Sequence, residues 1–211
     1  MHQAVEQILE KRIRRTMDAL RANNMEAYYV KTAAEVRAFV EQLVPAGATV
    51  SNGGSVSLAE TGVMELLAGG RYHYLDRSKA QGDELAALYR QVFSADWYFA
   101  SANAVTEAGE IYNVDGNANR VAAITFGPKN VLLVVGCNKL VKDMPTAEER
   151  VRQIAAPANT ARLGCKTPCA VTGKCEDCHS PGRICCTAVV HRYQREQGRI
   201  KVLLVGEPLG F

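Results

Sequence analysis

Apolar residues recur at helical and strand spacing along most of the chain. Between residues 3 and 22 an apolar side chain returns every three or four positions, which predicts one amphipathic helix. Its stripe consists of Val5, Leu9, Ile13, Met17 and Leu20. Residues 25–30 (MEAYYV) then predict a short strand, and residues 33–43 predict a second helix that ends at Pro45 and Gly47.

The same alternation continues through the first half of the sequence. The pattern predicts strands at residues 49–51, 72–75 and 97–100, and helices from about Ser57 and over residues 83–93. Helices and strands in strict order with short connections are typical of a parallel sheet that has helices on its faces.

The second half predicts more strands and a cysteine-rich excursion. Strand-like runs occupy residues 110–114, 121–126 and 131–135, and the last run is continuously apolar, as in a strand buried on both faces. A capping-box pattern at Thr146–Glu149 predicts a helix over residues 147–155. Residues 200–205 (IKVLLV) predict a final strand that rejoins the sheet, so we expect one α/β domain.

Composition narrows the class of protein. The 211 residues are 47% hydrophobic and 22% charged, which is typical of a globular protein and not of a disordered one. A net charge of +3 does not favour nucleic-acid binding. No apolar run reaches the roughly 18 to 20 residues of a membrane span, and the charged N-terminus has no secretory signal. We therefore expect a cytoplasmic protein without nucleic-acid or membrane partners.

A glycine-rich segment follows the predicted strand at residues 49–51. Asn52, Gly53, Gly54 and Ser55 lie just before a predicted helix. Glycines allow the backbone to approach a ligand and to direct N–H groups at an anion, so phosphate or carboxylate binding is one interpretation. The alternative is a simple turn followed by a Ser57–Glu60 capping box. Neither a dinucleotide fingerprint nor a P-loop is present.

Residues 103–120 are dense in hydrogen-bonding side chains. Glu107, and Glu110 or Asp115, are candidates for acid or base chemistry, and Arg120 is a candidate clamp for a carboxylate or phosphate. The alternative is a plain hairpin, because Asp115-Gly116 is a strong turn signal.

Six of the seven cysteines fall in one short segment. They are Cys165, Cys169, Cys175, Cys178, Cys185 and Cys186. In a reducing compartment such a cluster favours metal or redox chemistry over disulfides. The single C-x2-C and the irregular spacers leave zinc and an iron–sulfur cluster both open. Neighbours in a strand point to opposite faces, so Cys185 and Cys186 are not expected to share a metal. Cys137 is expected to be an inert core thiol.

Several motifs together resemble the LUD (lactate-utilisation) family. They are N-G-G-S-x-S-L-x-E-x-G (52–62), T-E-x-G-E-I-x-N-x-D-G-x-x-N-R-V-A (106–122), F-G-P-x-x-V-L-x-V-V-G-x-N-K (126–139), A-P-x-N (156–159), T-P-C-x5-C-x2-C-x6-C (167–185) and the terminal L-V-G-E-x-L-G-F. The resemblance covers nearly all of the chain beyond the first helix. It implies an α/β fold, a three-layer α/β/α Rossmann-like sandwich similar to the ribose-5-phosphate isomerase and coenzyme A transferase group. Residues 1–24 would form an N-terminal helix and residues 25–211 the LUD-like domain, including a metal-binding segment at residues 160–190.

The resemblance also implies site residues. It strengthens the assignment of an anion to the glycine-rich loop (Asn52, Gly53, Gly54, Ser55) and to the polar loop (Asn113, Asp115, Asn119, Arg120). Four cysteines match the family pattern and are the expected metal ligands: Cys169, Cys175, Cys178 and Cys185. Cys165 and Cys186 lie outside the pattern, so the ligand set stays open.

The leading hypothesis is a component of cytoplasmic lactate or related organic-acid oxidation with one cysteine-bound metal centre. Arg120 would pair with a small anionic metabolite, and Glu60 or Glu107 would handle a proton. Other lactate-oxidation subunits are possible partners. Two alternatives remain: a metabolite-binding or regulatory subunit with a structural zinc, and an isomerase or transferase acting on a sugar phosphate or acyl-coenzyme A. Whether the chain is an enzyme stays open.

Overall fold

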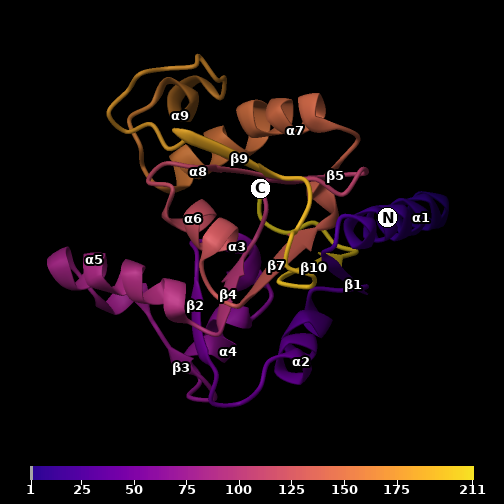
Figure 1. The fold of residues 1–211 in the computed structure, drawn as a ribbon. Helices are drawn as coiled ribbons and strands as arrows, with labels where there is room; N and C mark the ends of the chain where they lie inside the picture. The colour runs from indigo at the N-terminus through magenta and orange to yellow at the C-terminus, as the bar shows by residue number, and fades with distance from the viewer. Residues whose placement is uncertain (1) are drawn as a thin grey trace.

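A six-stranded parallel sheet forms the centre of the computed structural model, which describes residues 2–211; Met1 of the predicted segment 1–24 lies outside the described residues. The strands are β1 (Glu26–Val30), β2 (Thr49–Asn52), β3 (His73–Tyr74), β4 (Trp97–Ala100), β7 (Asn130–Gly136) and β10 (Ile200–Val205). Their order is β1-β10-β7-β4-β2-β3, and every neighbouring pair is parallel. Parallel pairing gathers all six carboxyl ends at one edge (Figure 1).

Helices cover both faces of this sheet. They are α1 (Gln3–Ala22), α2 (Ala34–Leu43), α3 (Val56–Glu60), α4 (Val63–Ala68) and α6 (Asn119–Phe126). A further helix, α5 (Gly82–Gln91), has no buried residue. Strand β7 shows the layering, because Val131 and Leu133 pack in the core that contains α1 and α6, whereas Leu132 and Val134 pack in the core that contains α2, α3 and α4. This period of two produces a sheet buried on both sides. The predicted three-layer α/β/α class is confirmed.

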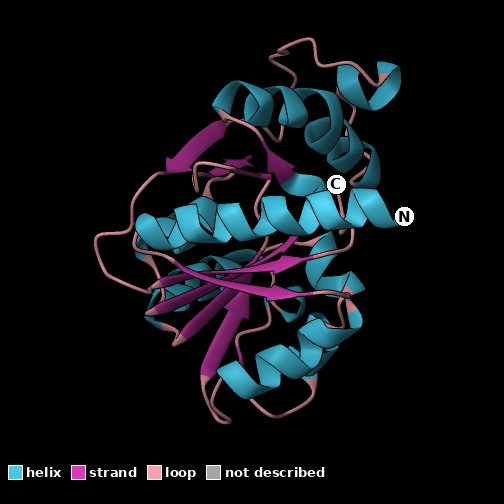
Figure 2. Ribbon diagram, turned by 90° about the vertical axis from the view of Figure 1, so that its right-hand side faces the viewer, coloured by secondary structure: helices cyan, strands magenta, loops and turns pink. Residues whose placement is uncertain are grey.

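A smaller sheet lies above the carboxyl edge of the large one (Figure 2). Its strands are β5 (Ala104–Thr106), β6 (Ile111–Asp115), β8 (Leu140–Val141) and β9 (Thr187–His191), in the order β8-β5-β6-β9. Helices α7 (Met144–Arg150), α8 (Ala156–Arg162) and α9 (Pro168–Thr172) accompany it. A third core joins this sheet to α7 and the following turn through Ala104, Tyr112 and Val151.

The strand predicted over residues 121–126 is wrong: these residues belong to α6. The β-branched residues Val121 and Ile124 are buried three positions apart, whereas Phe126 is 85% exposed, which is a helical and not a strand period. Both ends of the helix are satisfied by side chains. Asp115 accepts from the amide of Val121, and Arg199 donates to the carbonyls of Ala123 and Ile124.

The helix predicted over residues 147–155 is part of a longer helical run. It begins with α7, whose N-cap is Asp143 and not Thr146, and Asp143 accepts from the Thr146 amide at 3.0 Å. A π-helical turn (Val151–Ala155) then leads into α8. Pro157 lies in the first turn of α8 and has no N–H to donate. The π-helical turn therefore lies where the regular series of α-helical hydrogen bonds is already interrupted.

Helix α1 joins the two sheets. Its buried residues Ile13 and Leu20 share one core with β10 and with residues of the small sheet. Arg12 donates to Glu107 at 2.6 Å and to the carbonyl of Leu140 at 3.1 Å. Although α1 is the longest described helix, no helix within residues 2–211 combines the length and apolarity needed to cross a membrane.

The turn between β5 and β6 docks directly on the backbone of α1, which gives a test of the fold. Gly109 has a φ of +77°, and a Cβ there would lie 2.6 Å from the carbonyl carbon of Ala19. Gly70 has a similar φ of +82° but open space around a Cβ, so it is a matched control. Gly70→Ala is expected to cost about 1 kcal/mol of left-handed strain. Gly109→Ala adds backbone overlap and is expected to cost about 3 kcal/mol.

The measurement is the free energy of unfolding in urea for both variants. Equal losses for Gly109→Ala and Gly70→Ala would mean that the turn does not rest on α1 as described.

Candidate functional site

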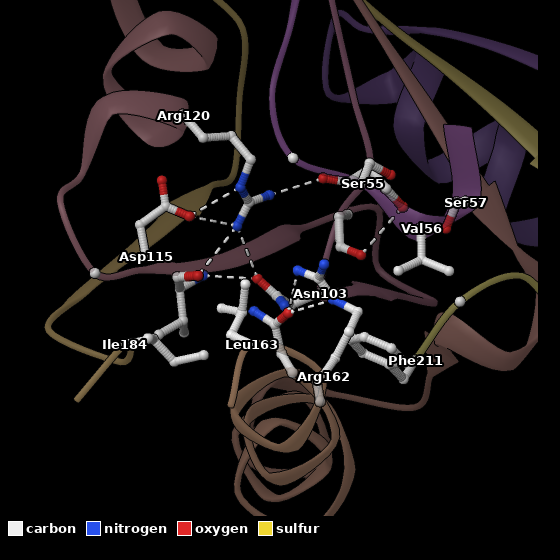
Figure 3. Close-up of a pocket in the computed structure, with 18 of the residues that line it drawn as sticks. Ser55, Val56, Ser57, Asn103, Asp115, Arg120, Arg162, Leu163, Ile184 and Phe211 are labelled. Atoms are coloured by element: carbon white, nitrogen blue, oxygen red, sulfur yellow. Dashed lines mark hydrogen bonds and ion pairs between the residues drawn. The ribbon is translucent and has the colours of Figure 1, made fainter. Parts of the chain in front are cut away.

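A pocket of about 380 Å³ lies where the carboxyl ends of the parallel strands meet the small sheet. The loop after β2 and the residues after β4 and β7 supply one wall, and the C-terminal residues Gly210 and Phe211 supply another. Figure 3 shows Ser55 and Ser57 across the pocket from Asp115, with Arg162 and Leu163 projecting from below. The carboxyl edge of parallel strands is the usual place for a ligand in open α/β sheets.

The pocket is strongly basic. Its basic lining residues come from five separate segments and are Arg77, Arg120, Lys139, Arg162 and Arg183. Of the described residues that line it, Asp115 is the only acidic one, and its carboxylate is 2.7 Å from the Arg120 guanidinium. Arg183 is paired with Asp177 outside the lining, whereas Arg77 and Arg162 have no ion pair among the described residues, so the field in the pocket favours an anion.

Two members of the glycine-rich loop, Gly54 and Ser55, line this pocket. Arg77 lies over Gly54, where a Cβ would be 2.8 Å from its Nη2 atom. Ser55 is the N-cap of α3 and accepts from the amide of Leu58, so the helix starts with Ser55 and not with the alternative Ser57–Glu60 capping box. The loop therefore presents small residues beside a guanidinium.

Gly53 and Asn52 lie behind the pocket wall. A Cβ on Gly53 would be 3.0 Å from both the Arg120 side chain and the Tyr98 hydroxyl, and the Gly53 amide donates to the carbonyl of Phe99. Asn52 accepts from the Tyr74 hydroxyl at 2.6 Å. These two predicted binding residues position the loop, and neither is among the lining residues.

Arg120 is held by the protein rather than left for a ligand. Nε donates to Asp115 at 2.8 Å, Nη1 to Asn113 and to the Ser101 carbonyl, and Nη2 to Asn103 and to the Val114 carbonyl. These bonds use all five N–H groups of a guanidinium. The predicted clamp is therefore corrected: Arg120 contributes charge to the pocket, and its hydrogen bonds fix the loops around it. The alternative hairpin at Asp115-Gly116 is also wrong, since β6 leads into α6.

The remaining members of the predicted polar loop surround Arg120. Asn113 is fully buried and accepts from Arg120 at 2.7 Å, and Asp115 also accepts from the amide of Val121. Asn119 and Asp115 line the pocket. Ala118, the N-cap of α6, has a φ of +58°, a conformation that costs a non-glycine residue of order 1 kcal/mol. The strain accompanies the tight passage from β6 into α6.

Glu60 and Glu107, the predicted proton-transfer residues, lie outside the pocket lining. Glu60 accepts from the Gly210 amide at 2.7 Å and so anchors the C-terminal residues beside the pocket. Glu107 pairs with Arg12 and Arg15 of α1. The structure therefore assigns Glu60 a positioning contact and Glu107 an ion pair between α1 and the small sheet.

Sequence reasoning missed four basic pocket residues, Arg77, Lys139, Arg162 and Arg183. Lys139 is the last residue of the 3₁₀ turn (Cys137–Lys139) that follows β7, and it is only 4% exposed. Nζ donates to Ser57 Oγ at 2.8 Å and to Ser101 Oγ at 3.0 Å. Burial, together with the charges of Arg150 and Arg120, lowers the pKa of Lys139 to about 7. The available signal for Lys139 was a lysine three positions after the end of a continuously apolar strand.

The cysteine-rich segment borders the same pocket. Arg183 and Ile184 line it, and the amide of Cys186 donates to the carbonyl of Asp115 at 2.9 Å. Arg183 also donates to the carbonyls of Cys178 and Cys185 and pairs with Asp177. One guanidinium therefore connects the loop that carries the predicted ligands to the basic pocket.

The sulfur atoms are all free thiols, and they are not disulfide-bonded among the described residues. Burial raises the pKa of Cys185, the Arg183 guanidinium acts in the opposite sense, and Cys175 and Cys178 add smaller raising contributions. Within residues 2–211, however, no three His, Cys, Asp or Glu side chains are placed as a metal-holding group. Thiolates suit zinc or iron–sulfur ligation, but the positions of these side chains do not form a coordination shell. The metal assignment stays a prediction.

The comparisons with known proteins concern most of the chain. The sequence matches the model of the LUD domain over residues 13–205. No match was found among the curated proteins.

Two solved structures are similar in fold. A DUF162 family protein from Deinococcus radiodurans is 16% identical, with a TM-score of 0.54 over 93% of this chain and 98% of that chain. A chain of a Pseudomonas malonate decarboxylase hetero-tetramer in complex with malonate is 13% identical, with a TM-score of 0.34 over 68% of this chain and 35% of that chain. The first similarity supports the fold; the second is too low to support an argument.

The buried Lys139 makes stability depend on pH in a defined direction. Its pKa falls from 10.5 in the unfolded chain to about 7 in the fold, so the unfolded state binds more protons between these values. The loss of stability caused by burying the charged Lys139 amine is greatest below pH 7, and it decreases as the pH rises toward 10.5. Lys139→Met is therefore expected to increase the free energy of unfolding at pH 6, and by much less at pH 9.

The measurement is urea unfolding of the wild type and Lys139→Met at both pH values. A difference between the two proteins that does not change from pH 6 to pH 9 would contradict a lowered pKa. Arg150, Arg120 and Glu60 are the charged groups that act on Lys139, and they are the same in both proteins.

Proposed function

The chain belongs to the LUD domain family, and we propose that its basic pocket binds a small anionic metabolite, a carboxylate or phosphate of organic-acid metabolism. The observation that carries the proposal is the lining of five basic residues against one acid that is already paired. A volume of about 380 Å³ suits a small metabolite and falls within the usual range for ligand pockets.

The proposed context is cytoplasmic oxidation of lactate or a related organic acid, with other subunits of that process as partners. The family supports this context, and the pocket supplies a place for the acid. Arg77 and Arg162 are the guanidinium groups that we assign to the carboxylate, because Arg120 is fully bonded within the protein and Arg183 holds the cysteine segment. Guanidinium groups bind carboxylates and phosphates with two parallel hydrogen bonds.

The same pocket is also compatible with two other functions. A metabolite-binding or regulatory subunit would use the anion site without turnover. An isomerase or transferase would bind a sugar phosphate or an acyl-coenzyme A there. This hypothesis rests on similarity of fold, which is weak support for an activity. The identity of the anion separates the three, so the test compares anions of each class.

Isothermal titration of the full chain with L-lactate, pyruvate, ribose 5-phosphate and coenzyme A tests the anion site. At least one is expected to bind, with an affinity that falls as salt rises. Arg162→Gln removes one charged donor and is expected to weaken that binding about tenfold. Arg37→Gln on α2, where Arg37 is exposed and pairs with Glu41, is the matched control and should leave affinity unchanged.

Absence of binding by any of the four compounds to the folded protein would contradict the proposed function. So would an affinity that Arg162→Gln and Arg37→Gln leave equally unchanged.

We further propose that Cys169, Cys175, Cys178 and Cys185 bind one metal centre, an iron–sulfur cluster or zinc. Support comes from the resemblance of their spacing to the family pattern and from their common loop. Cys169 lies at 3.4 Å from the hydroxyls of Thr160 and Thr167, so ligation requires its thiol to turn from these contacts.

Metal analysis and absorbance of anaerobically purified protein test this assignment. Iron with visible absorbance, or zinc, is expected in stoichiometric amount, and Cys178→Ser is expected to lose it. Cys137→Ser is the matched control, since Cys137 lies outside the segment and burial raises its pKa. A metal-free wild type whose thiols are all alkylated would overturn the assignment. Zinc whose removal unfolds the protein would favour the structural alternative.

A further inference from the structure

Lys139 occupies an unusual position for a lysine. It is buried at the carboxyl end of β7 and lines the basic pocket, with only hydroxyl groups as its hydrogen-bond partners. A second buried lysine in the chain is treated differently: Lys201 lies 3.6 Å from the carboxylate of Glu26. A buried ammonium normally requires such a partner, because burial of an unpaired charge is costly.

The hydrogen bonds around Lys139 match a neutral amine. Ser57 Oγ donates to the Leu209 carbonyl and Ser101 Oγ donates to the Ala102 carbonyl, so each hydroxyl is left to accept from Nζ. A neutral amine has two N–H groups, and these two acceptors satisfy both. An ammonium has three. The neutral form also leaves a lone pair on a nitrogen that borders the pocket.

The charged neighbours keep the amine in that form. Arg150 is buried and is fixed by donating to the carbonyls of Asn138 and Asn103, which flank the Lys139 site. Arg120 is fixed by its own five bonds. Glu60 is the acidic group that acts in the opposite sense, but it is exposed and bonded to the Gly210 amide. A desolvated amine beside fixed cations is an activated nucleophile.

We propose that Lys139 is a covalent catalytic residue that forms an imine with an anionic carbonyl compound bound in the pocket. This step rests on the proposed function, because the basic lining must first hold the anion. The Nζ lone pair attacks the carbonyl carbon and gives a carbinolamine. Loss of the carbonyl oxygen as water, with the two amine hydrogens, then leaves the C=N bond. The balance requires no oxidant or reductant. Ser57 and Ser101 are the positioning residues for the amine.

Reductive trapping tests the proposal in the full chain. The protein is incubated with pyruvate, as a 2-oxo acid, or with glyceraldehyde 3-phosphate, as an aldehyde phosphate, in the presence of cyanoborohydride. One reduced adduct per chain is expected in the intact mass with at least one of the two, and peptide mapping is expected to place it on Lys139. At pH 7 the neutral fraction of Lys139 exceeds that of an ordinary lysine by about a thousandfold, so its labelling should dominate.

Two variants and a pH series make the result specific. Lys139→Met is expected to abolish the adduct, whereas Lys201→Met, which removes the other buried lysine, is expected to retain it. Adduct formation is expected to increase between pH 6 and pH 8. If Lys139→Met does not fold, the position of the adduct in the wild type alone decides the question.

The outcomes separate this inference from the proposed function. An anion that binds by calorimetry but gives no adduct, or an adduct spread over exposed lysines, overturns the imine and leaves the anion site intact. If no compound binds and no compound forms an adduct, both the imine and the proposed anion site are overturned.

Discussion

The guanidinium of Arg120 fixes the geometry on which the pocket depends. It reaches the residues that follow β4 through Ser101 and Asn103, and the end of β6 through Asn113 and Asp115. Gly53 leaves the space that its side chain occupies. Removing one partner of such a buried, hydrogen-bonded ion pair commonly costs about 3 to 5 kcal/mol. Arg120 donates to the Ser101 carbonyl, and the Ser101 hydroxyl accepts from Lys139. The side chain that orders the loops therefore also positions one of the two hydrogen-bond partners of Lys139.

A basic pocket built in this way is a destabilising feature that the rest of the fold must tolerate. Lys139 and Arg150 are buried with no carboxylate of residues 2–211 in hydrogen-bond contact, and burial lowers the pKa of both. The carbonyls of Asn138 and Asn103 offset part of the cost for Arg150, and two serine hydroxyls do so for Lys139. Such concentrations of one charge persist where a site uses them, which is consistent with an anion held in the pocket.

The sequence predicted the large sheet well because its signals are local. The run at residues 131–135 is apolar on both faces, and the glycine-rich loop follows a strand directly, so both could be assigned from neighbours in the chain. The small sheet was missed as a unit because two of its three strand pairings are remote in sequence: β8 pairs with β5, and β9 pairs with β6 from the far end of the chain, whereas only β5 and β6 are sequence neighbours. The role of Glu107 was missed for the same reason, since its partner Arg12 lies on α1. The strand prediction for residues 121–126 was wrong because their β-branched side chains are typical of strands. In the fold these residues form a short helix whose two ends are bonded to the Asp115 and Arg199 side chains.

The cysteine-rich segment and the pocket share a wall, which the spacing of the cysteines does not reveal. Arg183 and Ile184 lie between Cys178 and Cys185 and face the pocket, and the Cys186 amide is bonded to the Asp115 carbonyl. Any change in the order of this segment therefore changes the pocket next to Arg120. The proposed metal centre and the proposed anion site are therefore adjacent, and metal content and anion affinity should be measured on the same preparation.

The protonation state of Lys139 is the most direct test of this account. Lysine-selective ¹³C labelling allows its side-chain resonance to be followed by NMR between pH 5 and pH 11, with the signal assigned by its absence in a Lys139 variant. Burial and the charges of Arg150 and Arg120 are expected to set the titration midpoint near pH 7. A midpoint near 10.5, the ordinary value for lysine, would contradict it.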